Sequence, residues 1–171
     1  MKFTKEDARK RVLNCAKQYQ QNLLHKKLLI IFRERQDNSI RFIEVVFHER
    51  NYQHLTGLEL INTEGKILQH QSKNFYRKCI ENKLGLNDVD KVMGGVNFCL
   101  GLSRENDVFV PSSALLEDIK KLTASPSQVL AIFEKDIDSE LYSTVKHVAK
   151  GLNLHHLILP PEINSKILLP K

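Results

Sequence analysis

The sequence lacks the features that would place it in a membrane or in several common enzyme classes. No apolar run approaches the ~20 residues that a transmembrane helix needs, and the N-terminus has no signal-type apolar core. The P-loop motif GxxxxGK followed by Ser or Thr is absent, as are GxGxxG, HExxH, CxxC and GxSxG, which argues against those types of nucleotide binding, zinc hydrolysis and serine hydrolysis. We therefore expect a cytoplasmic protein that needs no membrane, no cofactor and no metal.

Cysteine is also scarce. The three cysteines, Cys15, Cys79 and Cys99, are odd in number, widely spaced and set among apolar neighbours. This pattern is typical of buried thiols in a reducing compartment rather than of disulfides or a metal centre.

Acidic residues are few at the N-terminus. Residues 1–35 hold ten Lys or Arg and three Asp or Glu, whereas the remainder holds sixteen and seventeen, so the whole net charge of +6 arises near the N-terminus. Lys10 and Lys17 project from the polar face of a predicted helix there. Such a basic surface is typical of proteins that bind nucleic acid, and we expect the partner to be RNA. A basic helix that is only solvated would have the same charge.

The hydrophobic pattern predicts a single α+β domain over residues 1–171, in which an antiparallel sheet of hairpins packs against several helices, beginning with an N-terminal helix. Helices are expected over 4–25 with Thr4 as cap, over 73–83 with Ser72 as cap, from Pro111-Ser112-Ser113 through Leu115, Ile119 and Leu122, and from Asp138 to Gly151. Strands are expected at 28–32, 40–47, 58–62, 96–103, 108–110 and 128–133. Residues 85–95 are predicted to form a flexible loop, and residues 152–171 an apolar tail.

The densest group of chemically useful side chains follows the second strand, from Arg50 to Gly57. His54 can transfer a proton near neutral pH, Arg50 can hold a phosphate, and Thr56 can donate a hydrogen bond to it. The alternative is that His54 only satisfies the strand end and that Arg50 pairs with Glu49. Clustering within a few positions favours the functional interpretation.

Two further positions carry less specific signals. Glu44 stands within the apolar run 40–47, where a carboxylate needs a partner; it is a candidate general base or one half of a cross-strand ion pair with Arg33 or Arg35. Ser112 and Ser113 would offer hydroxyls and backbone amides to an anion at the start of the expected helix, or would simply cap it.

The order and spacing of several segments resemble a known family, the fourth phage-type group of nuclease-like domains in the Barnase, EndoU, Colicin and RelE superfamily. The resemblance is carried by Phe42-Ile43-Glu44-Val45-Val46-Phe47 leading to Arg50-Asn51 and His54-Leu55-Thr56-Gly57, by Phe75-Tyr76-Arg77-Lys78-Cys79, and by Phe109-Val110-Pro111 with Leu116-Glu117-Asp118-Ile119. It covers most of the chain.

This resemblance implies a metal-independent ribonuclease of phage or mobile-element type, with a toxin-like role and a neutralising protein partner. It implies His54 as acid or base, Arg50 as phosphate clamp, Thr56 and Tyr76 as orienting hydrogen-bond donors, Lys78 and the Ser112 region as further phosphate contacts, and Glu44 as the second proton-transfer group. The alternative is a catalytically inactive module of the same fold that binds nucleic acid or a protein.

Overall fold

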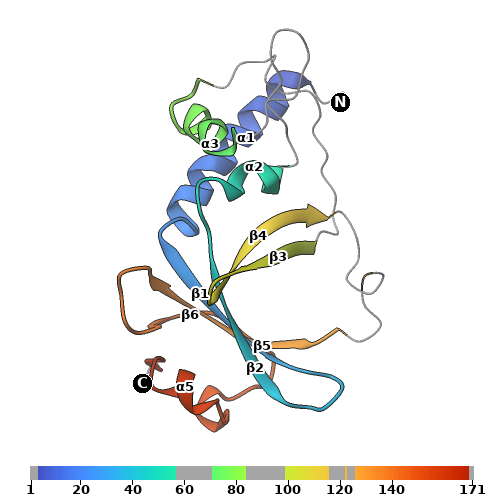
Figure 1. Ribbon diagram of the computed structural model, residues 1–171, viewed down its shortest axis with the longest axis vertical. Coiled ribbons are helices and arrows are strands. Elements are labelled where there is room, and N and C mark those ends of the chain that lie inside the picture. Colours follow the sequence, from blue (N-terminus) through green and yellow to red (C-terminus); the bar gives the residue numbers. More distant parts are fainter. Residues whose placement is uncertain (1–3, 57–70, 84–98, 116–121, 123–125, 170–171) are drawn as a thin grey trace.

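The fold is α+β, with one mixed, mostly antiparallel sheet among the described residues (Figure 1). The computed structural model describes residues 4–56, 71–83, 99–115, 122 and 126–169. The elements are α1 (Lys5–Asn22), β1 (Lys26–Arg33), β2 (Ile40–Val46), α2 (Asn51–Thr56), α3 (Ser72–Ile80), β3 (Cys99–Glu105), β4 (Val108–Leu115), β5 (Gln128–Asp136), β6 (Thr144–Val148), the 3-10 helix η2 (Leu154–His156) and α5 (Pro161–Asn164). The expected strand at 58–62 and loop at 85–95 lie outside these residues.

The strand order is β3-β4-β2-β1-β5-β6. β1 lies at the centre, antiparallel to β2 and to β5, and β6 forms one edge against β5. The β3–β4 hairpin joins β2 through one parallel pair, Val45 with Phe109. This junction brings the hairpin close to the chain that leaves β2.

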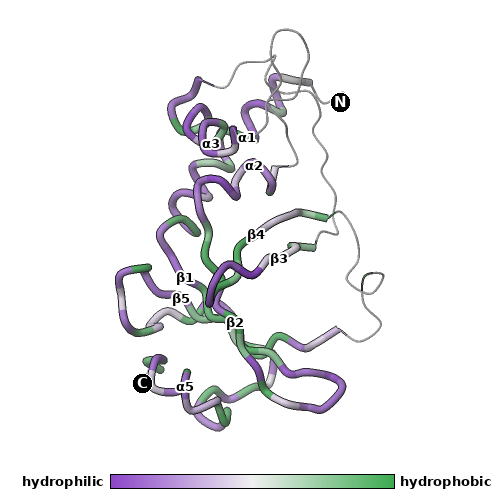
Figure 2. The backbone as a smooth tube through the Cα atoms, viewed as in Figure 1, coloured by the Kyte–Doolittle hydropathy of each residue, from purple (hydrophilic) through white to green (hydrophobic). Residues whose placement is uncertain are grey.

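Each face of the sheet carries its own buried cluster. Alternate residues of β1 point to opposite faces: Leu28 and Ile30 pack against α1, α2 and α3, while Leu29 and Ile31 pack against β5 and the C-terminal segment, residues 149–169. We call these the helical face and the C-terminal face. Helices α1, α2 and α3 gather at one end of the molecule, and the C-terminal segment with α5 lies at the other, with hydrophobic residues concentrated where β1, β2 and β5 cross (Figures 1 and 2).

The N-terminal helix forms as its pattern predicts. Thr4 caps it: the Asp7 backbone N–H donates to the Thr4 hydroxyl oxygen at 3.1 Å, and the Thr4 backbone N–H donates to the Asp7 carboxylate at 3.0 Å. Its apolar stripe is buried on the helical face and comprises Ala8, Val12, Ala16 and Tyr19. The prediction of buried thiols holds for Cys79, but Cys15 is exposed and Cys99 only partly buried.

The two hairpins are confirmed, and both turn at asparagines in the left-handed region, Asn38 with φ 56° and Asn106 with φ 53°. The helix expected from Pro111 is wrong, because β4 continues through Leu115 and pairs with β3. Gly101 allows this pairing, since a side chain there would collide with the Ser113 hydroxyl.

The helix expected from Asp138 to Gly151 is also wrong. Residues 144–148 form β6, with Val145 opposite Phe133 and Val148 opposite Ala131, so the free edge of β5 outweighs the helical spacing of the apolar residues. The N-cap of α3 is Gln71, without a side-chain bond, rather than Ser72. The apolar tail becomes the cover of the C-terminal face, where Ile163 is fully buried.

Candidate functional site

Asn51 fixes the connection between β2 and α2. Its side-chain oxygen accepts a hydrogen bond from the His48 backbone N–H at 2.8 Å, and its side-chain nitrogen donates to the Pro111 carbonyl oxygen at 2.8 Å. The Tyr19 hydroxyl donates to the His48 carbonyl oxygen, also at 2.8 Å. Because Asn51 is only 4% exposed, these bonds form in a poorly solvated place and hold the backbone on either side of Arg50.

One pocket forms between this connection and the β3–β4 hairpin; we call it the Arg50–His54 pocket. It has a volume of about 190 Å³ and is lined by Arg50, Asn51, His54, Ser103, Glu105, Val110, Pro111 and Ser112. Within it Arg50 forms an ion pair with Glu105, and both side chains are about half exposed. A guanidinium, a carboxylate and an exposed imidazole thus line one small pocket.

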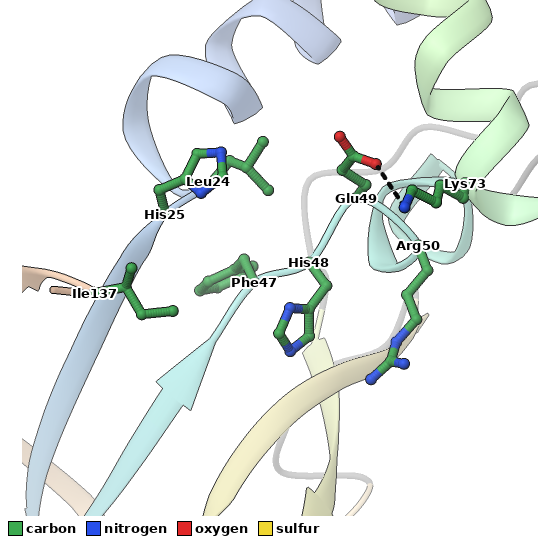
Figure 3. A pocket seen from close by; sticks show the side chains of 8 residues that line it. All are labelled: Leu24, His25, Phe47, His48, Glu49, Arg50, Lys73 and Ile137. Atoms are coloured by element: carbon green, nitrogen blue, oxygen red, sulfur yellow. Dashed lines mark ion pairs between the residues drawn. The ribbon is translucent and has the colours of Figure 1, made fainter.

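Arg50 also lines a second pocket, which we call the His48 pocket. It has a volume of about 360 Å³ and is lined by Leu24, His25, Phe47, His48, Glu49, Arg50, Lys73 and Ile137 (Figure 3). Lys73 of α3 pairs with Glu49 at 3.9 Å. Burial lowers the pKa of His48, the Arg50 guanidinium lowers it further, and the Glu105 carboxylate opposes both.

A third hollow, the α1–α3 groove, contains the two lysines predicted to bind nucleic acid. Lys10 and Lys17 are exposed and line it together with Arg9, Glu6 and residues of α3, around a volume of about 320 Å³. The two lysines therefore line a groove between α1 and α3.

The structure brings together only part of the predicted site. Arg50, His54 and Ser112 line one pocket, whereas Thr56 lines a separate apolar groove on the other side of α2, beside Tyr52, and donates to the Gln53 carbonyl oxygen at 2.7 Å. Ser112 reaches the pocket from a strand rather than from a helix start, and its hydroxyl donates to the Gly101 carbonyl oxygen at 3.2 Å.

Tyr76 is 3% exposed and belongs to the aromatic cluster of the helical face, 6.1 Å from Tyr19 and 5.7 Å from Tyr52 between ring centres. Burial raises the pKa of its phenol. Its hydroxyl has no hydrogen-bond partner among the described residues. This placement is that of a core residue.

Glu44 points to the C-terminal face. It accepts a hydrogen bond from the Tyr142 hydroxyl and pairs with Lys27 at 3.6 Å, so neither expected partner, Arg33 or Arg35, holds it. The remaining predicted contacts are Lys78, partly buried on α3, and Ser113, packed beside Gly101.

Sequence reasoning missed four residues that the fold brings to Arg50: Glu105, His48, Lys73 and His25. Glu105 is 55 positions from Arg50, and no local spacing connects them. His48 lies two positions before Arg50, just outside the polar segment that begins there. In the described ranges no three His, Cys, Asp or Glu side chains are grouped to hold a metal ion, and no helix there is long and apolar enough to cross a membrane.

A basic α+β chain with an arginine, a histidine and a glutamate in one pocket fits the class of small phosphodiester-cleaving proteins. Residues 11–95 match the family described as phage-Barnase-EndoU-ColicinE5/D-RelE like nuclease4. Over this segment the chain is similar to that phage-type nuclease family. No curated protein and no solved structure matches this chain. The matched segment supplies Arg50, His54 and His48, while Glu105 and Ser112 come from outside it.

Proposed function

We propose that the protein is a metal-independent ribonuclease in which His54 and Glu105 transfer the protons and Arg50 holds the scissile phosphate. The observation that carries the proposal is the meeting of these three side chains in the Arg50–His54 pocket. Cleavage by the 2′-hydroxyl needs a base, an acid and a cation, and this set supplies one of each.

The reaction balances with these groups alone. The Glu105 carboxylate takes the proton of the 2′-hydroxyl, the 2′-oxygen attacks phosphorus, and the bond from phosphorus to the 5′-oxygen breaks. Protonated His54 gives its proton to the leaving 5′-oxygen, and Arg50 stabilises the charge on the phosphoryl oxygens. The products are a 2′,3′-cyclic phosphate and a 5′-hydroxyl.

Glu105 takes the role for which Glu44 was the sequence-based candidate. A base must reach the substrate, and the Glu105 side chain is 43% exposed beside Arg50, whereas that of Glu44 is 16% exposed and closed off by Lys27 and Tyr142. The α1–α3 groove supports an RNA partner, because Arg9, Lys10 and Lys17 give it a basic lining.

The test is cleavage of tRNA, total RNA and single-stranded DNA in the presence of chelator, with the new ends mapped. RNA should yield 2′,3′-cyclic phosphate ends, and DNA should stay intact because it lacks the attacking hydroxyl. His54→Ala should lower the rate about 10²- to 10⁴-fold, whereas His156→Ala, at an exposed position of η2, should retain it. Arg50→Ala should weaken both binding and turnover.

Two outcomes would change the assignment. Cleaved DNA would exclude attack by the 2′-hydroxyl. RNA that is bound but never cleaved would mark the protein as an inactive nucleic-acid-binding module. A toxin role, with a neutralising protein partner, would follow from RNA cleavage that arrests growth of a host expressing the wild type but not one expressing His54→Ala.

A further inference from the structure

We propose that the His48 pocket is a second phosphate subsite, which binds the RNA phosphate adjacent to the one that is cleaved. This inference rests on the proposed function and adds a substrate preference: oligonucleotides that carry a phosphate beyond the scissile one. The sequence alone offers no indication of a binding site in this pocket.

The two pockets share one cation. Arg50 lines both of them, so an RNA strand held by Arg50 is within reach of both linings. Successive phosphates of a single strand are neighbours along the backbone, and a groove that binds RNA must meet more than one of them.

The lining of the His48 pocket suits an anion. His25 precedes β1, His48 and Arg50 follow β2, and Lys73 comes from α3, so three separate parts of the chain direct basic side chains to one place. Glu49 is the single carboxylate of the lining, and its ion pair with Lys73 is long, at 3.9 Å, with Lys73 62% exposed. A phosphate can compete with this loose pair for the ammonium group.

The wall of the pocket is fixed by backbone contacts. His25 adopts a φ of 62°, in the left-handed region that few residues other than glycine occupy, and its carbonyl oxygen accepts a hydrogen bond from the Ile137 N–H at 2.8 Å. Leu24 forms a parallel bridge with Phe47. The start of β1, the end of β2 and the turn after β5 are thus joined around the pocket.

The same wall offers an apolar surface. Ile137 is 41% exposed and lies near Phe47 and His25, on the side of the pocket opposite Arg50 and Lys73 (Figure 3). A nucleotide presents a charged phosphate together with the less polar faces of its sugar and base, and the pocket combines both kinds of partner. A free inorganic anion would use only the charged part.

The first experiment compares the kcat/KM for a dinucleoside monophosphate with that for the same dinucleotide carrying one extra terminal phosphate, at the 3′ end or at the 5′ end. One of these phosphates should raise kcat/KM of the wild type about tenfold, the size of a charge-assisted hydrogen bond near the lower end of its range. Lys73→Gln should remove most of this gain and Glu49→Gln should increase it.

Lys83→Gln is the matched control, because Lys83 is an exposed lysine just past α3 that pairs with Glu81 and lies outside the lining of the pocket. It should keep the wild-type gain. No gain in the wild type from either phosphate, or the same gain in Lys73→Gln as in the wild type, would overturn the subsite.

The second experiment measures binding without cleavage, using 2′-deoxy dinucleotides with and without the extra phosphate, labelled for fluorescence anisotropy. The extra phosphate should tighten binding to the wild type about tenfold and to Lys73→Gln much less. If no RNA is cleaved but this difference persists, the proposed nuclease activity fails and the subsite stands. If RNA is cleaved but the extra phosphate changes neither kcat/KM nor affinity, the subsite fails alone.

Discussion

Both faces of the sheet place charged groups beside a buried cluster, but these groups differ in how accessible they are to a substrate. On the C-terminal face, the Glu44 side chain is 16% exposed and is held by Lys27 at 3.6 Å and by the Tyr142 hydroxyl. On the helical face, Arg50 and Glu105 form an ion pair at the exit of β2, and both side chains are about half exposed to solvent.

The difference teaches that burial of a carboxylate does not by itself mark a catalytic group. Glu44 looked like a candidate because it interrupts an apolar run, yet its neighbours close it off. Glu105 ends an ordinary strand, yet the hairpin carries it to Arg50. What distinguishes them is access for a substrate, which depends on how the elements pack.

The largest expected effect is on the rate of RNA cleavage, and it distinguishes Glu105 from Glu44. Glu105→Gln should lower the rate of RNA cleavage about 10²- to 10⁴-fold, because it removes the proposed base and keeps the shape of the side chain. Glu44→Gln should leave the cleavage rate within about twofold, because its contacts lie on the C-terminal face. Single-turnover cleavage of a defined RNA measures both.

A loss of activity in Glu44→Gln with Glu105→Gln unaffected would reverse the assignment of the two carboxylates. Thermal unfolding of each variant serves as the control, since a misfolded protein would lose activity for an unrelated reason.

The second prediction compares the buried tyrosines of the two faces. Tyr142→Phe should reduce the free energy of unfolding by about 1.5–3 kcal/mol, because the hydroxyl donates to the charged Glu44. Tyr76→Phe should be neutral or slightly stabilising, because its buried hydroxyl has no partner among the described residues. Denaturant unfolding measures both changes.

Tyr76→Phe should also cleave RNA at the wild-type rate. A loss of cleavage in a stable Tyr76→Phe protein would restore the orienting role that the family resemblance implied for Tyr76.

Much of the fold could be predicted because it depends on local pattern. Thr4 and the apolar stripe of α1 define that helix, and the asparagine turns define both hairpins. The wrong secondary-structure predictions lie where pairing with a neighbouring strand determines the conformation. Leu141, Val145 and Val148 have helical spacing, but β5 offers an edge that residues 144–148 complete, and Leu141 is left 42% exposed.

The site divides in the same way. Arg50 and His54 lie four positions apart, and sequence reasoning found both. Glu105, Lys73 and His25 come from β3, α3 and the start of β1, and only the packing of these elements brings them to Arg50. A single sequence contains no local signal that these residues lie close together in the fold.

The third prediction compares the lysines of the α1–α3 groove with lysines of the C-terminal segment in RNA binding. Lys10→Gln with Lys17→Gln should reduce the slope of log affinity against log salt by about 0.7 for each phosphate contact that is lost. Lys150→Gln with Lys166→Gln, at exposed positions of the C-terminal segment, should leave the slope unchanged. Titrations of a labelled single-stranded RNA at several salt concentrations give the slopes. Equal slopes for both double variants would place the RNA path away from the α1–α3 groove.

The smallest expected effect concerns the pH dependence of stability at His48. Its folded pKa is lowered, first by burial and then by Arg50, whereas the unfolded pKa is about 6.5. The unfolded chain therefore binds the proton more readily, so the contribution of His48 to stability is present above about pH 6.5 and is lost as the pH falls from there toward the folded pKa. His48→Gln should flatten the decline in unfolding free energy over this window.

Arg50→Gln should flatten that decline only in part, because burial is the larger cause of the lowered pKa and persists without the guanidinium. Denaturant unfolding at half-unit steps from about pH 7.5 to 5 gives the three curves; the interval brackets the ordinary histidine pKa. A His48→Gln curve with the wild-type slope would show that His48 is as well solvated in the pocket as in the unfolded chain. A steeper Arg50→Gln curve would mean that the guanidinium stabilises the charged imidazole, opposite to the repulsion expected between neighbouring cations.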